Sequence, residues 1–293
     1  MKIAIYGQFY HKDSLIYIDS LLDTLNKRSV SYYIESNFYK LILKEHPEVH
    51  PSKYNSFKTL DDSYDLLISI GGDGTILRAI TYIKDLNIPI VGINSGRLGF
   101  LATIQKDQIE KAIDEIIKGN FKISERNLLC IETSPENKEL KALNFALNEI
   151  AVSRKNTTSM ITVETHLNEE YLTSYWADGL IISTPTGSTG YSLSCGGPVI
   201  MPEANNFVLT PIAPHNLNAR PLVISDETEI RLKVSGREEN YLVSLDSRIA
   251  TLENNTIVKI KKADFSIKMI ELQDESFLIT LRKKLLWGED KRN

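Results

Sequence analysis

The chain has 293 residues, of which 42% are hydrophobic and 25% charged, a composition typical of a folded globular protein and not of a disordered or fibrous one. Its formal net charge of −4 provides no overall attraction to nucleic acid or to an anionic membrane, and its length predicts two domains. Two cysteines, Cys130 and Cys195, are too few for a disulfide framework.

No apolar run reaches the roughly 18 residues that a membrane-spanning helix needs. The first residues, MKIAIYGQFYHKD, lack the apolar core and the cleavage site of a signal peptide. We therefore expect a cytoplasmic protein that has neither nucleic acid nor a membrane as a partner.

The first hundred residues alternate between strand-like and helix-like segments. Strands are predicted over Lys2–Tyr6, Tyr32–Ile34, Asp65–Ile70 and Ile88–Ile93. One helix is predicted to begin at Asp13, with Leu15, Ile18, Leu21, Leu22 and Leu25 on one face, and a second to end before Pro47, with Phe38, Leu41 and Ile42 inward. Two further helices are predicted over Ile76–Leu86 and over Lys106–Lys118, the latter ending at Gly119. This alternation predicts right-handed βαβ units on a largely parallel sheet.

After about residue 120 the pattern becomes mostly strand-like. Strands are predicted near residues 122–133, 147–153, 160–166, 179–184, 222–235, 241–245, 256–262 and 265–272. Helical signal returns only around Ser188–Ser194 and in the basic tail Phe277–Trp287, which we expect to pack back on the first domain. The predicted fold is an N-terminal doubly wound α/β domain (residues 1–104, with 276–293) plus a β-rich, β-sandwich-like C-terminal domain (residues 105–275).

A glycine-rich loop, Ser69-Ile-Gly-Gly-Asp-Gly-Thr75, lies between a predicted buried strand and a helix. Backbone N–H groups that lead into a helix N-terminus form an anion site suited to phosphates, and glycines let a ligand approach closely. Asp73 is unusual in such a loop because a carboxylate repels phosphate. It could accept a proton from an attacking hydroxyl, hold Mg²⁺ beside phosphates, or simply cap the helix.

The loop fits neither the P-loop pattern GxxxxGK[ST] nor the dinucleotide pattern GxGxxG. It resembles the GGDGT signature shared by NAD kinases, diacylglycerol and sphingosine kinases and, more distantly, phosphofructokinases. All of these enzymes transfer phosphate to a hydroxyl group.

A second cluster, DGLIISTPTGSTGYSLSCGGP, occupies residues 178–198. Hydroxyl residues and glycines surround Tyr191 here, which is compatible with a nucleoside pocket in which the ring stacks on a base. A helix start with a Ser/Thr cap and a buried tyrosine explains the same residues.

This second cluster resembles the TPTGSTAYSLSAGGP signature of NAD kinases. Ala146-Leu-Asn-Glu149 resembles the N-E/D motif of that family, Asn94–Phe100 its NxGxLGF segment, and Pro214–Pro221 its PHTLSxRP stretch. The motifs occur in family order over roughly residues 65–250. The chain is thereby identified as a member of the NAD kinase family.

The resemblance implies a role for particular residues. Asp73 would be the general base toward the 2′-hydroxyl of the adenosine ribose, Glu149 would bind ribose hydroxyls, and Asn148 the adenine edge. The remaining predicted contacts are Gly74 beside the substrate, Asp178 toward the nicotinamide half, and Thr189, Gly190, Tyr191, Ser192, Leu193 and Ser194 along the adenosine. Arg78 would either offset phosphate charge or be a solvated helix side chain.

The resemblance also implies ATP as phosphoryl donor, NAD as acceptor, Mg²⁺ with no assigned ligands, and a homodimer or homotetramer. The alternatives are a lipid kinase of the same superfamily and a non-catalytic NAD(P) sensor. Three positions depart from the family pattern: Gly190 replaces Ala, Trp176 replaces an Arg common in bacteria, and Arg248 replaces Gln or Asn.

Overall fold

The computed structural model describes residues 1–8, 14–45, 54–156 and 159–288. The chain divides into two compact units: unit 1 comprises Met1–Glu125 and Ile267–Asn293, and unit 2 comprises Arg126–Ser266. The sequence placed the divisions at residues 104 and 275 instead. The first boundary lies later because α4 (Ile109–Ile117) buries Ile109, Ile113 and Ile116 in the hydrophobic core of unit 1, and the second lies earlier because Ile270 is buried in the same core.

A parallel sheet forms the centre of unit 1, with strand order β3-β2-β1-β4-β5. Its strands are β1 (Lys2–Gly7), β2 (Ser31–Glu35), β3 (Asn55–Phe57), β4 (Leu66–Gly71) and β5 (Ile90–Asn94). Its other helices before α4 are α1 (Ser14–Lys27), α2 (Ser36–Glu45), α3 (Asp73–Ile83) and the 3₁₀ helix η1 (Lys106–Gln108). All six residues of β4 are buried, as expected of a strand covered on both faces.

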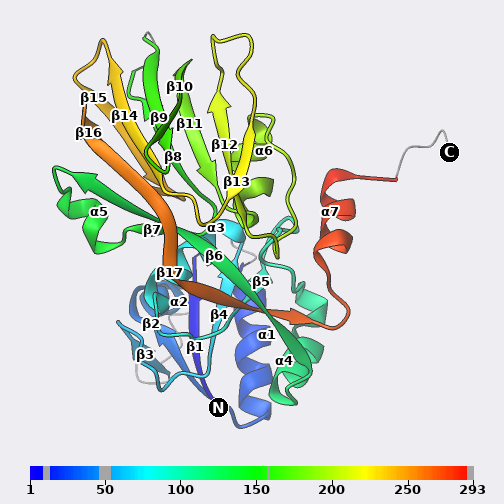
Figure 1. Ribbon diagram of the computed structural model, residues 1–293. Coiled ribbons are helices and arrows are strands. Elements are labelled where there is room, and N and C mark those ends of the chain that lie inside the picture. Colours follow the sequence, from blue (N-terminus) through cyan, green and yellow to red (C-terminus); the bar gives the residue numbers. More distant parts are fainter. Residues whose placement is uncertain (9–13, 46–53, 157–158, 289–293) are drawn as a thin grey trace. The chain divides into compact units, whose positions relative to one another are not determined.

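Helices cover both faces of this sheet. Buried side chains of α1, α2 and α4 form one cluster with β1, β4 and β5, and α1 lies beside α4 in Figure 1. The buried residues of α3 lie outside that cluster, although α3 also packs on β1, β4 and β5. The prediction of a doubly wound α/β domain is confirmed.

Two details of the helices differ from the prediction. Leu41, expected to point inward, is 41% exposed, because the buried face of α2 is formed by Phe38, Tyr39 and Ile42. Helix α3 begins at Asp73 rather than at Ile76, and it ends at Ile83 because Lys84 adopts a positive φ of 50°. Two predicted helix boundaries, Asp13 and Pro47, lie outside the described residues.

Unit 2 consists of antiparallel strands in two sheets. One has the order β13-β12-β11-β8-β15-β16, and the other contains β10-β9-β14-β17. The strands within unit 2 are β7 (Phe145–Ala146), β8 (Glu149–Arg154), β9 (Ile161–Leu167), β10 (Glu170–Ala177), β11 (Gly179–Ser183), β12 (Asn206–Ile212), β13 (Leu222–Ser225), β14 (Ile230–Gly236), β15 (Asn240–Leu245) and β16 (Arg248–Glu253). Its helical segments are α5 (Lys138–Ala142), η2 (Thr186–Thr189) and α6 (Tyr191–Ser194).

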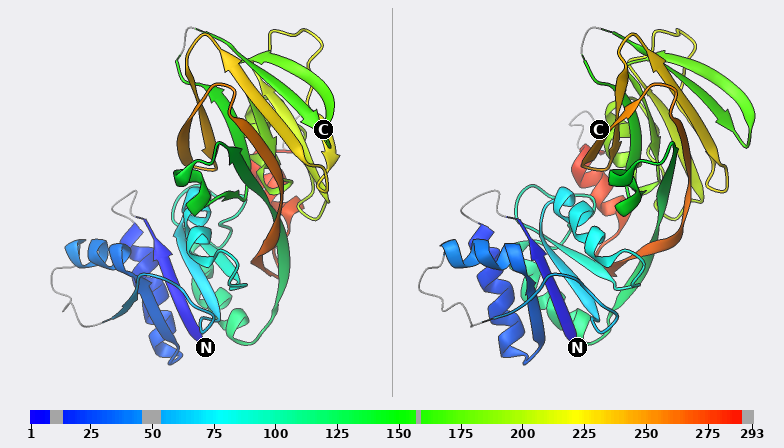
Figure 2. Two further views of the ribbon diagram at one scale, coloured as in Figure 1. Left: turned by 60° about the vertical axis from the view of Figure 1, so that its left-hand side comes forward. Right: turned by 90° about the vertical axis from the view of Figure 1, so that its left-hand side faces the viewer.

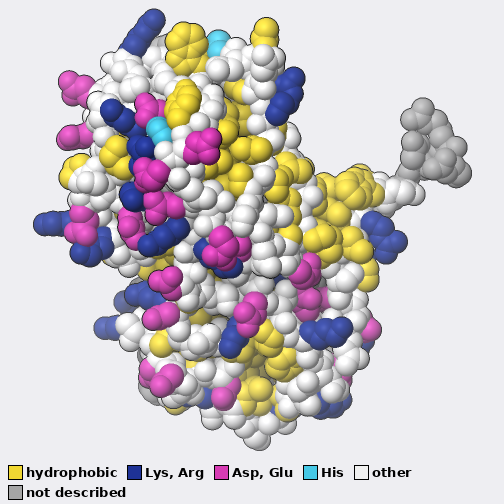
Figure 3. Space-filling view, viewed as in Figure 1, with side chains coloured by type: hydrophobic (Ala, Val, Ile, Leu, Met, Phe, Trp, Pro, Cys, Tyr) yellow, Lys and Arg dark blue, Asp and Glu magenta, His cyan; other side chains and the backbone are white. Residues whose placement is uncertain are grey.

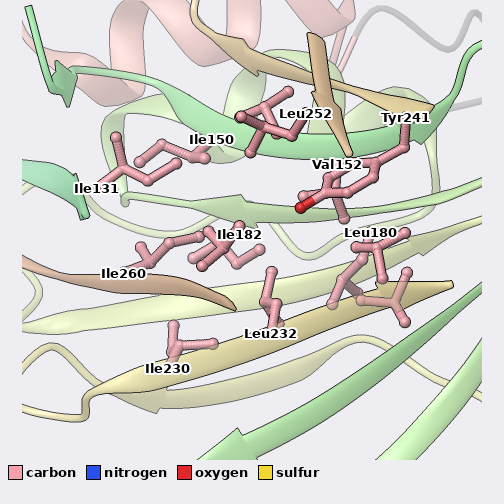
Figure 4. Close-up of a cluster of buried hydrophobic side chains, with 14 of the residues drawn as sticks. Ile131, Ile150, Val152, Leu180, Ile182, Ile230, Leu232, Tyr241, Leu252 and Ile260 are labelled. Atoms are coloured by element: carbon pink, nitrogen blue, oxygen red, sulfur yellow. The ribbon is translucent and has the colours of Figure 1, made fainter. Parts of the chain in front are cut away.

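Side chains from both sheets form the hydrophobic core of unit 2. In Figure 4, Ile182 of β11 and Ile150 of β8 lie in the same cluster as Ile230 and Leu232 of β14 and Ile260 of β17. The alternation of buried and less buried residues along β14 is the pattern of a strand with one face on a core. The predicted β-rich C-terminal domain is therefore confirmed.

Two long strands, β6 (Phe121–Ser134) and β17 (Ile257–Leu272), each contain residues of both units. They pair with each other and lie side by side in both views of Figure 2. The sequence predicted two strands near residues 256–262 and 265–272. The strand is continuous because its first part pairs with β14 and Met269 pairs with Ile90 of β5.

The chain returns to unit 1 through α7 (Phe277–Leu285). Thr280 and Leu281 are buried, whereas Leu278 and the following Leu286 and Trp287 are exposed, and apolar and basic side chains are visible over this helix in Figure 3. Within the described part of the chain, none of the helices is long and apolar enough to cross a membrane.

Candidate active site

The glycine-rich loop begins where β4 ends. Gly71 has a φ of +152°, and a Cβ at this position would collide with the side chain of Thr75, so only glycine fits. A Cβ at Gly72 or Gly74 would meet no described atom within 4 Å. These two glycines therefore leave the loop backbone open to a ligand at the N-terminus of α3.

The carboxylate of Asp73 is held by a second loop of unit 1. Its Oδ2 accepts a hydrogen bond from the backbone N–H of Phe100 (2.7 Å), and its Oδ1 accepts from those of Leu101 and Ala102 (3.0 Å each). A Cβ at Gly99 would collide with the same carboxylate. Helix α3 is preceded by Gly72 and has no side-chain cap, so the reading of Asp73 as a helix cap is wrong.

Asn94, at the end of β5, shapes this second loop from the other side. Its Nδ2 donates to the carbonyl oxygens of Arg97 (2.8 Å) and Ala102 (3.1 Å), and its Oδ1 accepts from the N–H of Gly96 (2.7 Å). The family segment Asn94–Phe100 is thus part of a structured loop, and the amides of Phe100 and of the next two residues point at Asp73.

Arg78 lies on α3, after Asp73, and its side chain is exposed. Gly74 is also exposed. Asp73, Gly74 and Arg78 therefore belong to one continuous piece of unit 1.

In unit 2 the segment Leu147–Glu149 is fixed by a buried carboxylate. Asp246 accepts hydrogen bonds from the backbone N–H groups of Leu147 (3.0 Å), Asn148 (2.8 Å) and Glu149 (3.2 Å). Arg248 holds the preceding residues, because its Nη1 donates to the carbonyl of Leu143 (2.6 Å) and its Nη2 to that of Phe145. The backbone that carries Asn148 and Glu149 is thus held by side chains from the β15–β16 hairpin.

Two buried oxygens on this segment have no hydrogen-bond partner among the described residues: Oδ1 of Asn148 and Oε2 of Glu149. Burial, and secondly the charge of Asp246, raise the pKa of Glu149 to about 8, while the N–H of Tyr191 acts in the opposite direction. Buried polar atoms without a partner are rare in folded proteins. These two lie on adjacent residues of the motif segment, and other such atoms, for example the hydroxyl oxygen of Tyr241, are found elsewhere in the described chain.

The second motif folds against the same segment. A Cβ at Gly187 would collide with the backbone of Asn148, and a Cβ at Gly190 would lie 3.2 Å from Oε2 of Glu149 and 3.6 Å from Nδ2 of Asn148. Tyr191 follows with an exposed ring, 44% accessible. The structure thus brings Asn148, Glu149, Gly190 and Tyr191 together.

The other predicted contacts of this motif have neighbours within unit 2. Thr189 donates to the carbonyl of Thr186 (3.2 Å), and the buried hydroxyl of Ser192 forms a hydrogen bond with that of Thr210 (2.8 Å). Leu193 is half-buried and Ser194 is exposed. Ser192 therefore faces the interior with its side chain and could reach a ligand only through its main chain.

Asp178 forms an ion pair with Arg154, at 2.8 Å between carboxylate and guanidinium. Sequence reasoning did not identify Arg154, because the pair depends on the β8–β11 register, in which Ser153 lies opposite Gly179. It also missed the roles of Asp246 and of the amides 100–102, which come from contacts between distant residues. Trp176, one of the departures, is 58% exposed on β10.

Comparison with known proteins follows the same division of the chain. The model of the ATP-NAD kinase N-terminal domain matches residues 3–121, and that of the C-terminal domain matches residues 147–272. The NAD kinases of Christiangramia forsetii and Flavobacterium psychrophilum are 62% and 59% identical to the chain, and each alignment covers 100% of both sequences.

Two solved structures share the fold. Yeast NADH kinase complexed with NADH has a TM-score of 0.86 at 22% identity, covering 100% of this chain and 89% of that one. An NAD kinase from Archaeoglobus fulgidus in complex with ATP has a TM-score of 0.76 at 24% identity, covering 98% of this chain and 99% of that one.

Proposed function

The chain belongs to the ATP-NAD kinase family, and from this premise we propose how its residues transfer the γ-phosphoryl group of ATP to the 2′-hydroxyl of the adenosine ribose of NAD, giving NADP. The observation that carries the proposal is the pair of buried, unpaired oxygens on Asn148 and Glu149. The Asn148 oxygen would accept from the amino group of adenine, and Glu149 would bind ribose hydroxyls.

Asp73 would act as the general base. Its two oxygens offer about four lone-pair sites, of which the amides 100–102 use three, so Oδ2 retains one for a hydroxyl. Oδ2 would take the proton of the 2′-hydroxyl as its oxygen forms a bond to the γ-phosphorus. The bond from that phosphorus to ADP breaks, and ADP leaves. Most of the rate enhancement would come from positioning and from charge stabilisation.

The phosphates would be bound by the loop of Gly72 and Gly74 and by the N-terminus of α3, whose backbone N–H groups favour anions. Arg78 would offset phosphate charge from the first turns of the same helix. Magnesium, where bound, would neutralise charge on the triphosphate.

The described residues contain no group of three or more His, Cys, Asp or Glu that could hold a metal ion. Proteins usually bind Mg²⁺ through one or two carboxylates together with substrate phosphates and water. ATP would therefore bring most of the ligands of the ion.

In unit 2, Tyr191 would stack on the adenosine, supported by the open backbone of Gly190. Thr189, Ser192, Leu193 and Ser194 would complete this wall, and Asp178 with Arg154 would face the nicotinamide half. We further propose that the protein acts in the cytoplasm as a homodimer or homotetramer.

One assay tests the function. Purified protein is incubated with Mg-ATP and NAD, and NADP is measured by an NADP-specific dehydrogenase. We expect NADP to form in proportion to enzyme and time. Phosphorylation of diacylglycerol or sphingosine without NADP would favour a lipid kinase, and binding of NAD without product would favour a sensor.

A further inference from the structure

The loop that holds Asp73 is itself held by the C-terminal segment of the chain. Thr103, next to the last of the three amides, donates from Oγ1 to Oε2 of Glu275 at 2.6 Å. At the start of the loop, the ring of Phe100 lies against that of Phe277, with centroids 6.2 Å apart. Residues 275–277 therefore contact both ends of the loop that contacts Asp73.

The surroundings of Glu275 strengthen this hydrogen bond. The carboxylate lines a cavity of about 160 Å³ together with Leu98, Thr103 and Ile279. Burial raises the pKa of Glu275, and the hydroxyl of Thr103 is the main group that opposes this shift. A hydrogen bond to a carboxylate is stronger than one between neutral groups. Competition from water weakens such a bond, so partial burial of the carboxylate favours it.

The same cavity offers a matched comparison. Lys111 forms an ion pair with Asp274 at 2.6 Å, but the two side chains are 71% and 78% exposed. Exposed ion pairs contribute little because water screens them. Lys111 thus lines the same cavity as Glu275, and its ion pair is with Asp274 and not with the loop of residues 100–102.

We propose that Glu275, acting through Thr103, is a positioning residue that fixes the amides of Phe100, Leu101 and Ala102 and so orients the Asp73 carboxylate toward the reacting hydroxyl. Three amides can fix a carboxylate only if their own loop is fixed. This inference rests on the proposed role of Asp73 as general base.

The test compares disruptive with conservative variants. Thr103→Val removes the hydroxyl at nearly constant volume, and Glu275→Ala removes its acceptor, whereas Thr103→Ser and Glu275→Gln retain the hydrogen bond. We expect the first two to lower kcat by between about 5-fold and about 100-fold, the scale of small misplacements of a reacting group, with the KM values for NAD and ATP changed less than about twofold. Thr103→Ser, Glu275→Gln and the control Lys111→Met should keep near-wild-type kcat.

A double-mutant cycle shows whether the effect passes through Asp73. In an Asp73→Asn background, Thr103→Val and Glu275→Ala should cause no further fall in kcat. The inference is overturned if they lower kcat equally in both backgrounds, or if they leave kcat unchanged in an enzyme that Asp73→Asn inactivates. Near-normal turnover of Asp73→Asn alone would instead refute the base assignment in the proposed function.

Discussion

At the scale of single residues, two aspartates use their carboxylates in the same way in different units. Asp73 accepts hydrogen bonds from three consecutive backbone N–H groups, those of residues 100–102, and Asp246 accepts from those of residues 147–149. In both cases main-chain groups compensate the negative charge, and the carboxylate in return fixes a loop. Such a carboxylate keeps a defined orientation, which a base or a recognition segment requires.

Replacing Asp73 by Asn should abolish most of the turnover. The amide cannot take the proton, and its NH₂ group would face at least one of the three N–H donors. We expect kcat to fall by about 10²–10⁴-fold, the usual range for loss of a general base, while NAD binding measured by calorimetry stays within a few-fold. Turnover close to that of the wild type would contradict the assignment.

Glu149 predicts a pH dependence of stability. Its pKa rises from the ordinary 4.5 to about 8 in the folded protein, so between these pH values the folded state binds a proton that the unfolded state has lost. The free energy of unfolding therefore keeps the full contribution of the protonated Glu149 below pH 4.5. It falls as the pH rises above 4.5, and the contribution is lost as the pH rises through 8.

Glu149→Gln removes this contribution. The difference in melting temperature between Glu149→Gln and wild type, measured without ligand, should shift in favour of the variant from pH 5 to pH 8. Identical pH dependence of the two proteins would show that Glu149 does not titrate in this range.

At the scale of elements, the glycines of the two motifs differ in what they are needed for. Gly187 is required by packing, because a Cβ there would collide with the backbone of Asn148, whereas Gly72 has an extended backbone and no described atom within 4 Å of an added Cβ. Gly187→Ala should lower the free energy of unfolding by an amount typical of overpacked sites, about 1–3 kcal/mol, with a lower unfolding midpoint, and should weaken NAD binding. Gly72→Ala should leave the midpoint unchanged, and equal loss in both variants would refute the distinction.

The β15–β16 hairpin should depend on Arg248 for its attachment to the Leu143–Leu147 segment. Arg248 donates to two carbonyls, lies over the Phe145 ring at 5.3 Å, and is 3.9 Å from the buried Asp246. We expect Arg248→Gln to cost about 1–3 kcal/mol in urea unfolding, because buried groups lose partners. The exposed Arg237 is the control, and Arg237→Gln should cost little.

At the scale of the whole molecule, the sequence predicted the fold class, because hydrophobic period and Gly-rich turns are local signals. It predicted the all-buried strand β4 and the helices around it, but split β17 in two and left Leu41 on the wrong face. Those errors concern pairing partners and helix rotation, which tertiary contacts decide.

The residues of the candidate site also fall into two groups, those that the sequence could predict and those that it could not. Asp73, Asn148, Glu149 and Tyr191 lie in recognisable motifs, and so could be named from the sequence. The residues that orient them could not. Asp246 is 97 positions from Glu149 along the chain. Arg154 is 24 positions from Asp178, and Glu275 is 172 positions from Thr103. No local pattern records such distances.

The division of the chain also bears on synthesis. Unit 2 is one uninterrupted stretch inserted into unit 1, and unit 1 needs Ile267 onward to be complete. A ribosome therefore releases all of unit 2 before it delivers the last strand and helix of unit 1. A product that terminates before Glu275 would lack this carboxylate and α7, so its Asp73 loop would be without the hydrogen bond from Thr103 to Glu275.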